Sequence, residues 1–128
     1  MKNILLVDDD EAAHTYHRVM IEMANIEVNK VKSAYSVDEA INYLLSINEI
    51  SEKNTWPNFI LIDVNMPIKS GYDFLEEFTQ LTWQYPSPQI YFVSSTKNPS
   101  DIAKASSIGI LKGFETKFLQ KEFFESLS

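Results

Sequence analysis

The sequence predicts an α/β sandwich in which five strands and five helices alternate, and three observations support this fold class. Short, uninterrupted apolar runs at residues 4–7, 59–62 and 90–93 are typical of strands that are buried on both faces of a parallel sheet. Between these runs, apolar residues recur at helical spacing. Turn residues and helix caps separate the two kinds of segment. The alternation favours right-handed crossovers, and the 128 residues suit a single domain, 1–128, without an internal repeat or a second core.

Periodicity and capping predict two helices in the first half of the chain. The first follows the strand at 4–7 and has its apolar residues at Ala12, Ala13, Tyr16, Val19, Met20 and Met23. After a weak strand candidate around Val28 and Val31, residues 36–39 form a capping-box pattern. The helix that they open has its apolar positions at Val37, Ala40, Ile41, Leu44 and Leu45. Residues 46–58 are mostly polar, and we expect most of them to form a loop.

The second half of the chain repeats the alternation. A helix after the turn-rich residues 66–71 carries Phe74, Leu75, Phe78 and Leu81. Asn98 as N-cap and Pro99 at the first helical position predict a helix that ends near Ser107. The fifth strand is expected at residues 114–117, and a short closing helix is suggested by Leu119, Phe123, Phe124 and Leu127.

The composition excludes several classes of function. The chain has no cysteine, so it forms no disulfide and no Cys-ligated zinc site. Its net charge of −7 and the lack of a basic run argue against nucleic acid as a partner. Its apolar stretches are too short to cross a bilayer, and the first residues lack the apolar region of a signal peptide. We therefore expect a cytoplasmic protein with no membrane partner.

Carboxylates, hydroxyls and one lysine follow the predicted strands at the ends where open α/β sheets gather their functional residues. The first strand ends in Asp8, Asp9 and Asp10, the third in Asp63, the fourth in Ser94 and Ser95, and the fifth in Lys117. A lone aspartate after a strand is usually a helix cap or a turn residue, and a lone lysine there is usually solvated. Their joint placement at four strand ends is what predicts a site.

Several carboxylates at one sheet edge repel one another unless protons or a cation neutralise them. Mg²⁺ favours carboxylate oxygens and retains waters, so it leaves positions open for a phosphate oxygen. Asp63 could then attack phosphorus as a nucleophile. Lys117 and the metal would offset charge on the equatorial oxygens, and Ser94 could donate a hydrogen bond to the bound phosphoryl group.

These residues resemble the receiver domains of bacterial two-component response regulators, of the stand-alone chemotaxis-regulator type, and the resemblance covers nearly the whole chain. Residues 5–9 match the first strand of the family with its acidic pair. Residues 60–67, followed by Gly71, match the segment around the phosphorylated aspartate. Residues 93–95 match the strand-four Ser/Thr segment, and Lys117 matches the strand-five lysine. The resemblance implies a flavodoxin-like, doubly wound (βα)5 fold with strand order 2-1-3-4-5.

The resemblance also implies roles for individual residues. Asp63 would accept a phosphoryl group from a sensor histidine kinase or a phosphotransfer protein, and the chain would not be an enzyme in the ordinary sense. Mg²⁺ would bind Asp8, Asp9, Asp63 and the backbone carbonyl of Asn65. Ser94 and Phe114 would couple phosphorylation to a signalling surface of the fourth helix, fifth strand and fifth helix, which an unknown target would bind. Asn65 and Thr96 lie where the family tunes dephosphorylation.

Three features depart from the family pattern. Phe118 stands where the family usually has a proline after the lysine, often with a cis peptide. Because a non-proline cis bond costs about 2.5–4 kcal/mol, we expect a trans bond here. Glu115 takes a position in the fifth strand where the family prefers an apolar residue. The segment from Asp9 to Asp63 is longer than in compact members, by roughly ten residues that fall in the predicted loop at residues 46–58. This loop should enter the third strand at its amino end, away from Asp63.

Alternative functions remain open from the sequence. Phe118 and Glu115 motivate a pseudo-receiver, an interaction module that is not phosphorylated. A dehalogenase-type phosphohydrolase would place a second carboxylate where Asn65 lies, and a flavodoxin-type FMN protein would have a hydroxyl-rich loop in place of Asp8 and Asp9. We expect a stand-alone domain, although truncation could have removed an output domain. His14 and His17 are expected to be solvated or half-buried helix residues rather than functional ones.

Overall fold

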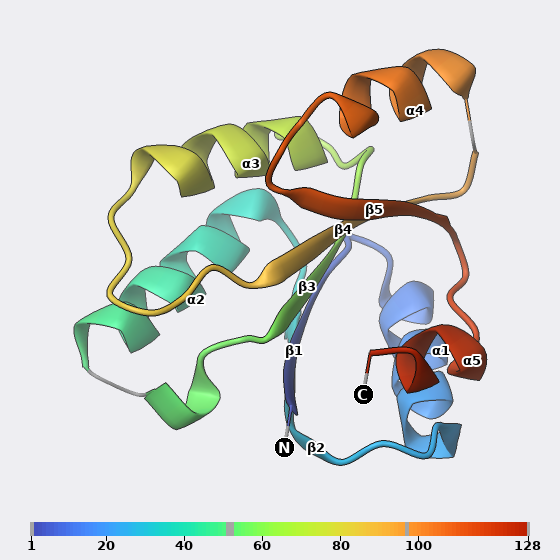
Figure 1. Cartoon of the computed structure of the whole chain (residues 1–128), viewed down its shortest axis with the longest axis horizontal. Helices are drawn as coiled ribbons and strands as arrows, with labels where there is room; N and C mark the ends of the chain where they lie inside the picture. Colours follow the sequence, from blue (N-terminus) through green and yellow to red (C-terminus); the bar gives the residue numbers. More distant parts are fainter. Residues whose placement is uncertain (1, 51–52, 97, 128) are drawn as a thin grey trace.

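A computed structural model of the chain describes residues 2–50, 53–96 and 98–127. The strands are β1 (Lys2–Val7), β2 (Val28–Ala34), β3 (Phe59–Asp63), β4 (Gln89–Ser94) and β5 (Leu111–Thr116). They form one parallel sheet in the order β2-β1-β3-β4-β5, as Figure 1 shows. This order confirms the predicted flavodoxin-like topology. It places β1, β3 and β4 inside the sheet, where helices on both faces bury their side chains, and this explains their continuous apolar sequences.

Helices cover both faces of the sheet. Their bounds are α1 (Glu11–Met23), α2 (Val37–Glu49), α3 (Gly71–Gln80), α4 (Pro99–Ser106) and α5 (Lys121–Glu125). Helices α1 and α5 lie together on one face, and α2 and α3 lie on the other (Figure 1). Each face has its own apolar cluster, one centred on Phe74 and Phe92 and the other on Ile4 and Phe124. The sheet therefore separates two cores, and its carboxyl edge is open between them.

Two of the predicted helix starts are confirmed by their caps. The Ser36 side chain accepts a hydrogen bond from the Glu39 backbone N–H at 3.1 Å, and the Asn98 side chain accepts one from Ser100 at 2.9 Å. Each satisfies a backbone donor that the first turn of a helix leaves free. Helix α3 starts with a full capping box between Ser70 and Asp73.

Only part of the apolar pattern predicted for α1 faces the core: Ala13 is buried and Met20 packs against the core cluster. The helix buries Ala13, His14, His17 and Ile21, whereas the side chains of Val19 and Met23 are 45% and 56% exposed. Apolar residues occur around most of this helix, so periodicity alone did not select one face. The two histidines complete the stripe that packs on the sheet, and they are buried rather than solvated.

The segment after α2 and the fifth strand also differ from expectation. Helix α2 continues to Glu49, so part of the predicted loop 46–58 is helical, and a 3-10 turn follows at Lys53–Thr55. Ile47 is buried in the same core as Trp56, and burial of this apolar side chain stabilises the extra helical turn. Residues 51–52 lie outside the described residues. Strand β5 starts earlier than predicted and ends at Thr116, so Lys117 follows the strand. Within the described residues no helix is long and apolar enough to cross a membrane.

Candidate functional site

The carboxyl ends of the strands bring the predicted residues together. Asp8 follows β1, Asp63 is the last residue of β3, Ser94 is the last of β4, and Lys117 follows β5. Strand pairing fixes their register: Asp63 pairs with Val93, and the Lys117 N–H donates to the Ser94 carbonyl at 2.8 Å. The four side chains are therefore placed by the sheet itself rather than by long loops.

Asp8, Asp9 and Asp63 form an acidic cluster. One carboxylate oxygen from each lies within 4.8 Å of the others. Asp8 and Asp63 are buried, and Asp9 is exposed, so the cluster opens to solvent on one side. The Asp10 side chain accepts a hydrogen bond from the Ala12 N–H at 3.0 Å and caps α1. Asp10 thus orients the helix, and the other three aspartates form the cluster.

Lys117 reaches into this cluster. Its Nζ lies 2.8 Å from the Asp8 carboxylate and 3.8 Å from the Asp63 carboxylate, and only 10% of the side chain is exposed. Burial opposes the charge on the ammonium, but the hydrogen bond and charge of Asp8, together with Asp63, raise the pKa of Lys117 above its usual value. The lysine is therefore a fixed positive charge between two of the carboxylates.

One ammonium does not balance three carboxylates, and the raised pKa of Asp63 reflects this excess of negative charge together with burial. Burial, followed by repulsion from Asp8, raises the pKa of Asp63 to about 6, although Lys117 and the Asn65 N–H act in the other direction. The Asn65 N–H donates to Asp63 at 3.3 Å. A divalent cation on these oxygens would supply the missing positive charge. The donor set, three carboxylates in a cluster that opens to solvent at Asp9, fits a hard cation such as Mg²⁺.

The residues around the cluster shape its rim. Ser94 is buried, and its Oγ accepts a hydrogen bond from the Thr96 N–H at 3.3 Å. Gly71 starts α3 directly behind Asp63, where its N–H donates to the Val64 carbonyl at 2.9 Å. A Cβ at Gly71 would lie 3.2 Å from the Asp63 carbonyl oxygen. Asn65 and Thr96 are exposed at the mouth of the site.

Phe114 lies farther along β5 and is half-buried. Its ring makes an edge-on contact with Phe92, with ring centroids 6.4 Å apart. It also lines a groove of about 410 Å³ between α4 and β5, together with Ile102 and Leu111. Glu115, the second departure from the family pattern, is half-buried on the same strand.

The expectation of a trans bond after Lys117 was wrong, because the Lys117–Phe118 peptide is cis. That expectation considered only the preference of an isolated peptide bond. In the structure, tertiary hydrogen bonds flank the bond on both sides: the Lys117 N–H donates to Ser94, and the Leu119 N–H donates to His17. The lysine reaches the carboxylates without the usual proline.

Two buried histidines below the cluster are the site's neighbours that sequence reasoning missed. His14 Nε2 lies 2.7 Å from the Asp8 carbonyl, and its Nδ1 has no hydrogen-bond partner among the described residues. His17 Nε2 lies 3.0 Å from the Leu119 nitrogen. Burial lowers the pKa of His17 to about 4, so its ring is neutral at neutral pH. Their spacing with Ala13 and Ile21 on one helical face was the available signal.

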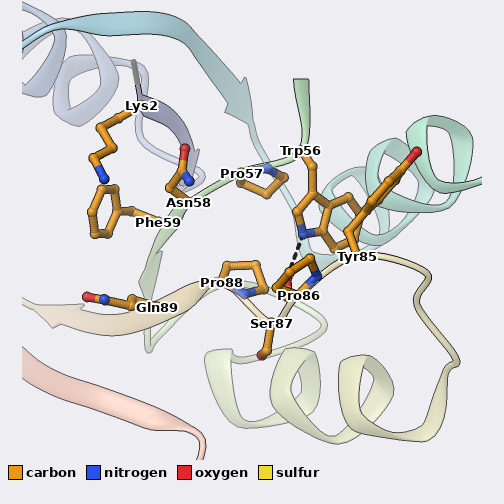
Figure 2. Close-up of a pocket in the computed structure, with 10 residues that line it drawn as sticks. All are labelled: Lys2, Trp56, Pro57, Asn58, Phe59, Tyr85, Pro86, Ser87, Pro88 and Gln89. Atoms are coloured by element: carbon orange, nitrogen blue, oxygen red, sulfur yellow. Dashed lines mark hydrogen bonds between the residues drawn. The ribbon is translucent and has the colours of Figure 1, made fainter. Parts of the chain in front are cut away.

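A second groove, of about 330 Å³, lies at the amino end of the sheet, where β1, β3 and β4 begin (Figure 2). Trp56, Tyr85 and three prolines line it, and the Trp56 indole N–H donates to the Pro86 carbonyl at 2.8 Å. The Asn58 N–H donates to the Asn3 carbonyl at 2.9 Å, which ties the segment before β3 to the start of β1. The longer connection therefore reaches β3 at its amino end.

Comparisons with known proteins agree with this geometry. The model of the response regulator receiver domain matches residues 4–127. A two-component response regulator from Cytophaga hutchinsonii is 28% identical with a TM-score of 0.81, and the match covers 98% of this chain and 92% of that one. A CheY-like receiver domain protein from Methanospirillum hungatei is 20% identical with a TM-score of 0.70, over 99% and 90% of the two chains.

A third similar structure is the Mn²⁺-bound form of response regulator Rcp1, which is 21% identical with a TM-score of 0.73, over 99% of this chain and 91% of that one. No curated protein matches the chain. The family model nevertheless spans almost every residue, including each of the four strand ends that form the acidic site. The chain therefore belongs to the response regulator receiver domain family.

Proposed function

We propose that this receiver domain accepts a phosphoryl group on Asp63 in a two-component phosphorelay, with Mg²⁺ held by Asp8, Asp9, Asp63 and the Asn65 carbonyl. The observation that carries the proposal is the Lys117 ammonium, which lies 2.8 Å from Asp8 and 3.8 Å from Asp63, two carboxylates that form a cluster with Asp9. A fixed cation beside a cluster of carboxylates is the arrangement that phosphoryl transfer to a carboxylate requires.

Each residue then has one task. An Asp63 oxygen attacks phosphorus as the donor's phosphorus–nitrogen bond to histidine breaks, and an acyl phosphate results. Lys117 pairs with the new phosphoryl oxygens, which keeps their charge compensated in a site that buries Asp63. Bound Mg²⁺ would supply the remaining positive charge. The Ser94 hydroxyl, at the end of β4, donates a hydrogen bond to the phosphoryl group.

The signalling step uses the surface of α4, β5 and α5. Movement of Ser94 toward the phosphoryl group opens space behind it, and Phe114 turns inward. This shift changes the groove that Phe114 lines with Ile102 and Leu111. Asn65 and Thr96, exposed at the mouth of the site, control how easily water reaches the acyl phosphate.

Family membership supports the general kind of partner. A sensor histidine kinase or a histidine phosphotransfer protein donates the phosphoryl group, and a downstream protein binds the switched surface. The similar Rcp1 structure is a Mn²⁺-bound form, and a divalent cation in that protein is in line with the Mg²⁺ site proposed for this chain. A cytoplasmic location stays a prediction from the sequence.

Incubation with acetyl phosphate and Mg²⁺, followed by intact mass spectrometry, tests the proposal. We expect one phosphoryl adduct on the wild type, and none on Asp63→Asn or after chelation of the metal. Asp38→Asn, an exposed aspartate on α2, is the matched control and should be phosphorylated normally. If the wild type forms no adduct, the chain is a pseudo-receiver that acts only as an interaction module.

A further inference from the structure

A buried hydrogen bond joins α1 to the loop between β5 and α5. His17 Nε2 lies 3.0 Å from the Leu119 nitrogen, and 102 residues separate the two in the sequence. The Leu119 N–H is the donor, so Nε2 supplies a lone pair and the ring proton must be on Nδ1. His17 and Leu119 are both buried, so neither can exchange this bond for one to water without opening the core.

The loop that receives this bond carries Lys117. On the strand side, the Lys117 N–H is held by the Ser94 carbonyl at 2.8 Å. On the helix side, the His17 bond holds Leu119, two residues later. Helix α5 has only five residues, and within the described chain no side chain caps its start at Gln120. The loop therefore depends on α1 for its position at this end.

Aromatic packing strengthens the same contact. The Phe118 ring, between the two fixed residues, lies 5.7 Å from the His17 ring and 5.1 Å from the Tyr16 ring, measured between centroids. Tyr16 also accepts a hydrogen bond from the Gln120 side chain at 2.7 Å, but this contact is exposed. His17 thus contributes both ring packing and a buried acceptor, and Tyr16 contributes packing and an exposed acceptor.

We propose that His17 is a positioning residue for Lys117: by accepting the Leu119 N–H, it fixes the loop so that the ammonium stays between Asp8 and Asp63. The inference rests on the proposed phosphorylation of Asp63. Lys117 Nζ is only 3.8 Å from Asp63, at the limit of an ion pair, so a loop shift of about an ångström removes this contact.

The test compares His17→Phe, which keeps an aromatic ring but has no acceptor, with His17→Gln, whose side-chain oxygen can accept the bond. Tyr16→Phe is the matched control, because it keeps the ring on Phe118 and loses only the exposed bond. Each variant is made in the wild type and in Lys117→Met. The rate of Asp63 phosphorylation by acetyl phosphate is measured by intact mass at saturating Mg²⁺.

We expect His17→Phe to slow phosphorylation about three- to tenfold, the range of one lost buried hydrogen bond. His17→Gln should recover most of the rate, and Tyr16→Phe should match the wild type. In the Lys117→Met background, His17→Phe should cause no further loss. An equal loss with and without Lys117, or an unchanged rate in His17→Phe, would overturn the proposal.

Urea unfolding of the same proteins, without phosphodonor, separates this inference from the proposed function. If His17 positions Lys117, then Lys117→Met should cost less stability in His17→Phe than in the wild type, because the ion pairs are already weakened. Additive effects on the free energy of unfolding would contradict the inference. A wild type that shows this coupling but forms no adduct would instead contradict only the proposed function.

Discussion

Lys117 is the residue on which the charge balance of the site depends. Its ammonium contacts oxygens of Asp8 and Asp63 that Mg²⁺ would also bind, so the two cations repel each other and compete. We predict that Lys117→Met tightens Mg²⁺ binding about three- to tenfold at low ionic strength, as measured by titration calorimetry. Lys112→Met is the control, because that exposed lysine lies near the opposite end of β5. Equal or weaker binding in Lys117→Met would mean that the lysine does not lie beside the ion.

At this scale, the sequence predicts residues whose chemistry follows from strand ends, and it fails where a side chain is defined by tertiary contacts. Asp8, Asp9, Asp63 and Lys117 meet at one edge because parallel strands end there. No such rule predicts the role of His17, because that role depends on Leu119, which is 102 residues away in the sequence. The cis bond at Lys117–Phe118 has no local sequence signal either, because Phe118 is not a proline.

The start of α3 depends on a glycine that packs against the end of β3. A Cβ at Gly71 would lie 3.1 Å from the Phe92 ring and 3.2 Å from the Val64 Cα, and backbone atoms cannot easily move aside. We predict that Gly71→Ala lowers the free energy of unfolding by about 1–3 kcal/mol in urea titrations. Because α3 packs directly behind Asp63, phosphorylation should also slow.

Gly109→Ala is the matched control for this prediction. A Cβ at Gly109 would meet nothing within 4 Å, so its effect on unfolding should stay within about 0.5 kcal/mol. If the two variants have equal stability, the close approach of α3 to β3 is not what requires Gly71.

Element boundaries were predicted well where a cap fixes them and poorly where packing does. Ser36 and Asn98 begin their helices as expected, because the side chain that satisfies the first turn is local. The end of α2 was placed too early, because Ile47 joins a core that includes Trp56. The apolar pattern of α1 predicted its buried face only in part for a related reason, since its polar histidines pack inward and its apolar Met23 does not.

For the whole molecule, topology follows from the sequence because the alternation of strands and helices leaves few right-handed arrangements. The strand order was confirmed, including the central position of β1 and β3 with their continuous apolar runs. The balance of buried charges could not be predicted in the same way. It depends on distances between Asp8, Asp63, Lys117 and the histidines beneath them, and the fold sets these distances.

Two of these groups act on stability in opposite directions as the pH falls. The raised pKa of Asp63, about 6 against 3.8, means that the folded state binds a proton more tightly than the unfolded chain. The stability that Asp63 contributes to the folded state is fully present below pH 3.8 and is lost as the pH rises through about 6. The pKa of His17 is lowered from 6.5 to about 4, so stability is lost as the pH falls through that range. The two contributions largely cancel between about pH 4 and 6 in the wild type.

Single substitutions should separate the two contributions. In the absence of divalent cations, Asp63→Asn should be more stable than the wild type at pH 7 by about 2–3 kcal/mol, and this gain should fade toward pH 4. The stability of His17→Phe relative to the wild type should rise as the pH falls from 7 toward 4, because the variant has no imidazole to protonate. Urea unfolding at several pH values measures both differences. Mg²⁺ should then stabilise the wild type more than Asp63→Asn, since the ion offsets both the burial and the repulsion that raise the Asp63 pKa. If both differences were independent of pH, Asp63 and His17 would have ordinary pKa values, and the cluster would carry no excess charge for a metal to neutralise.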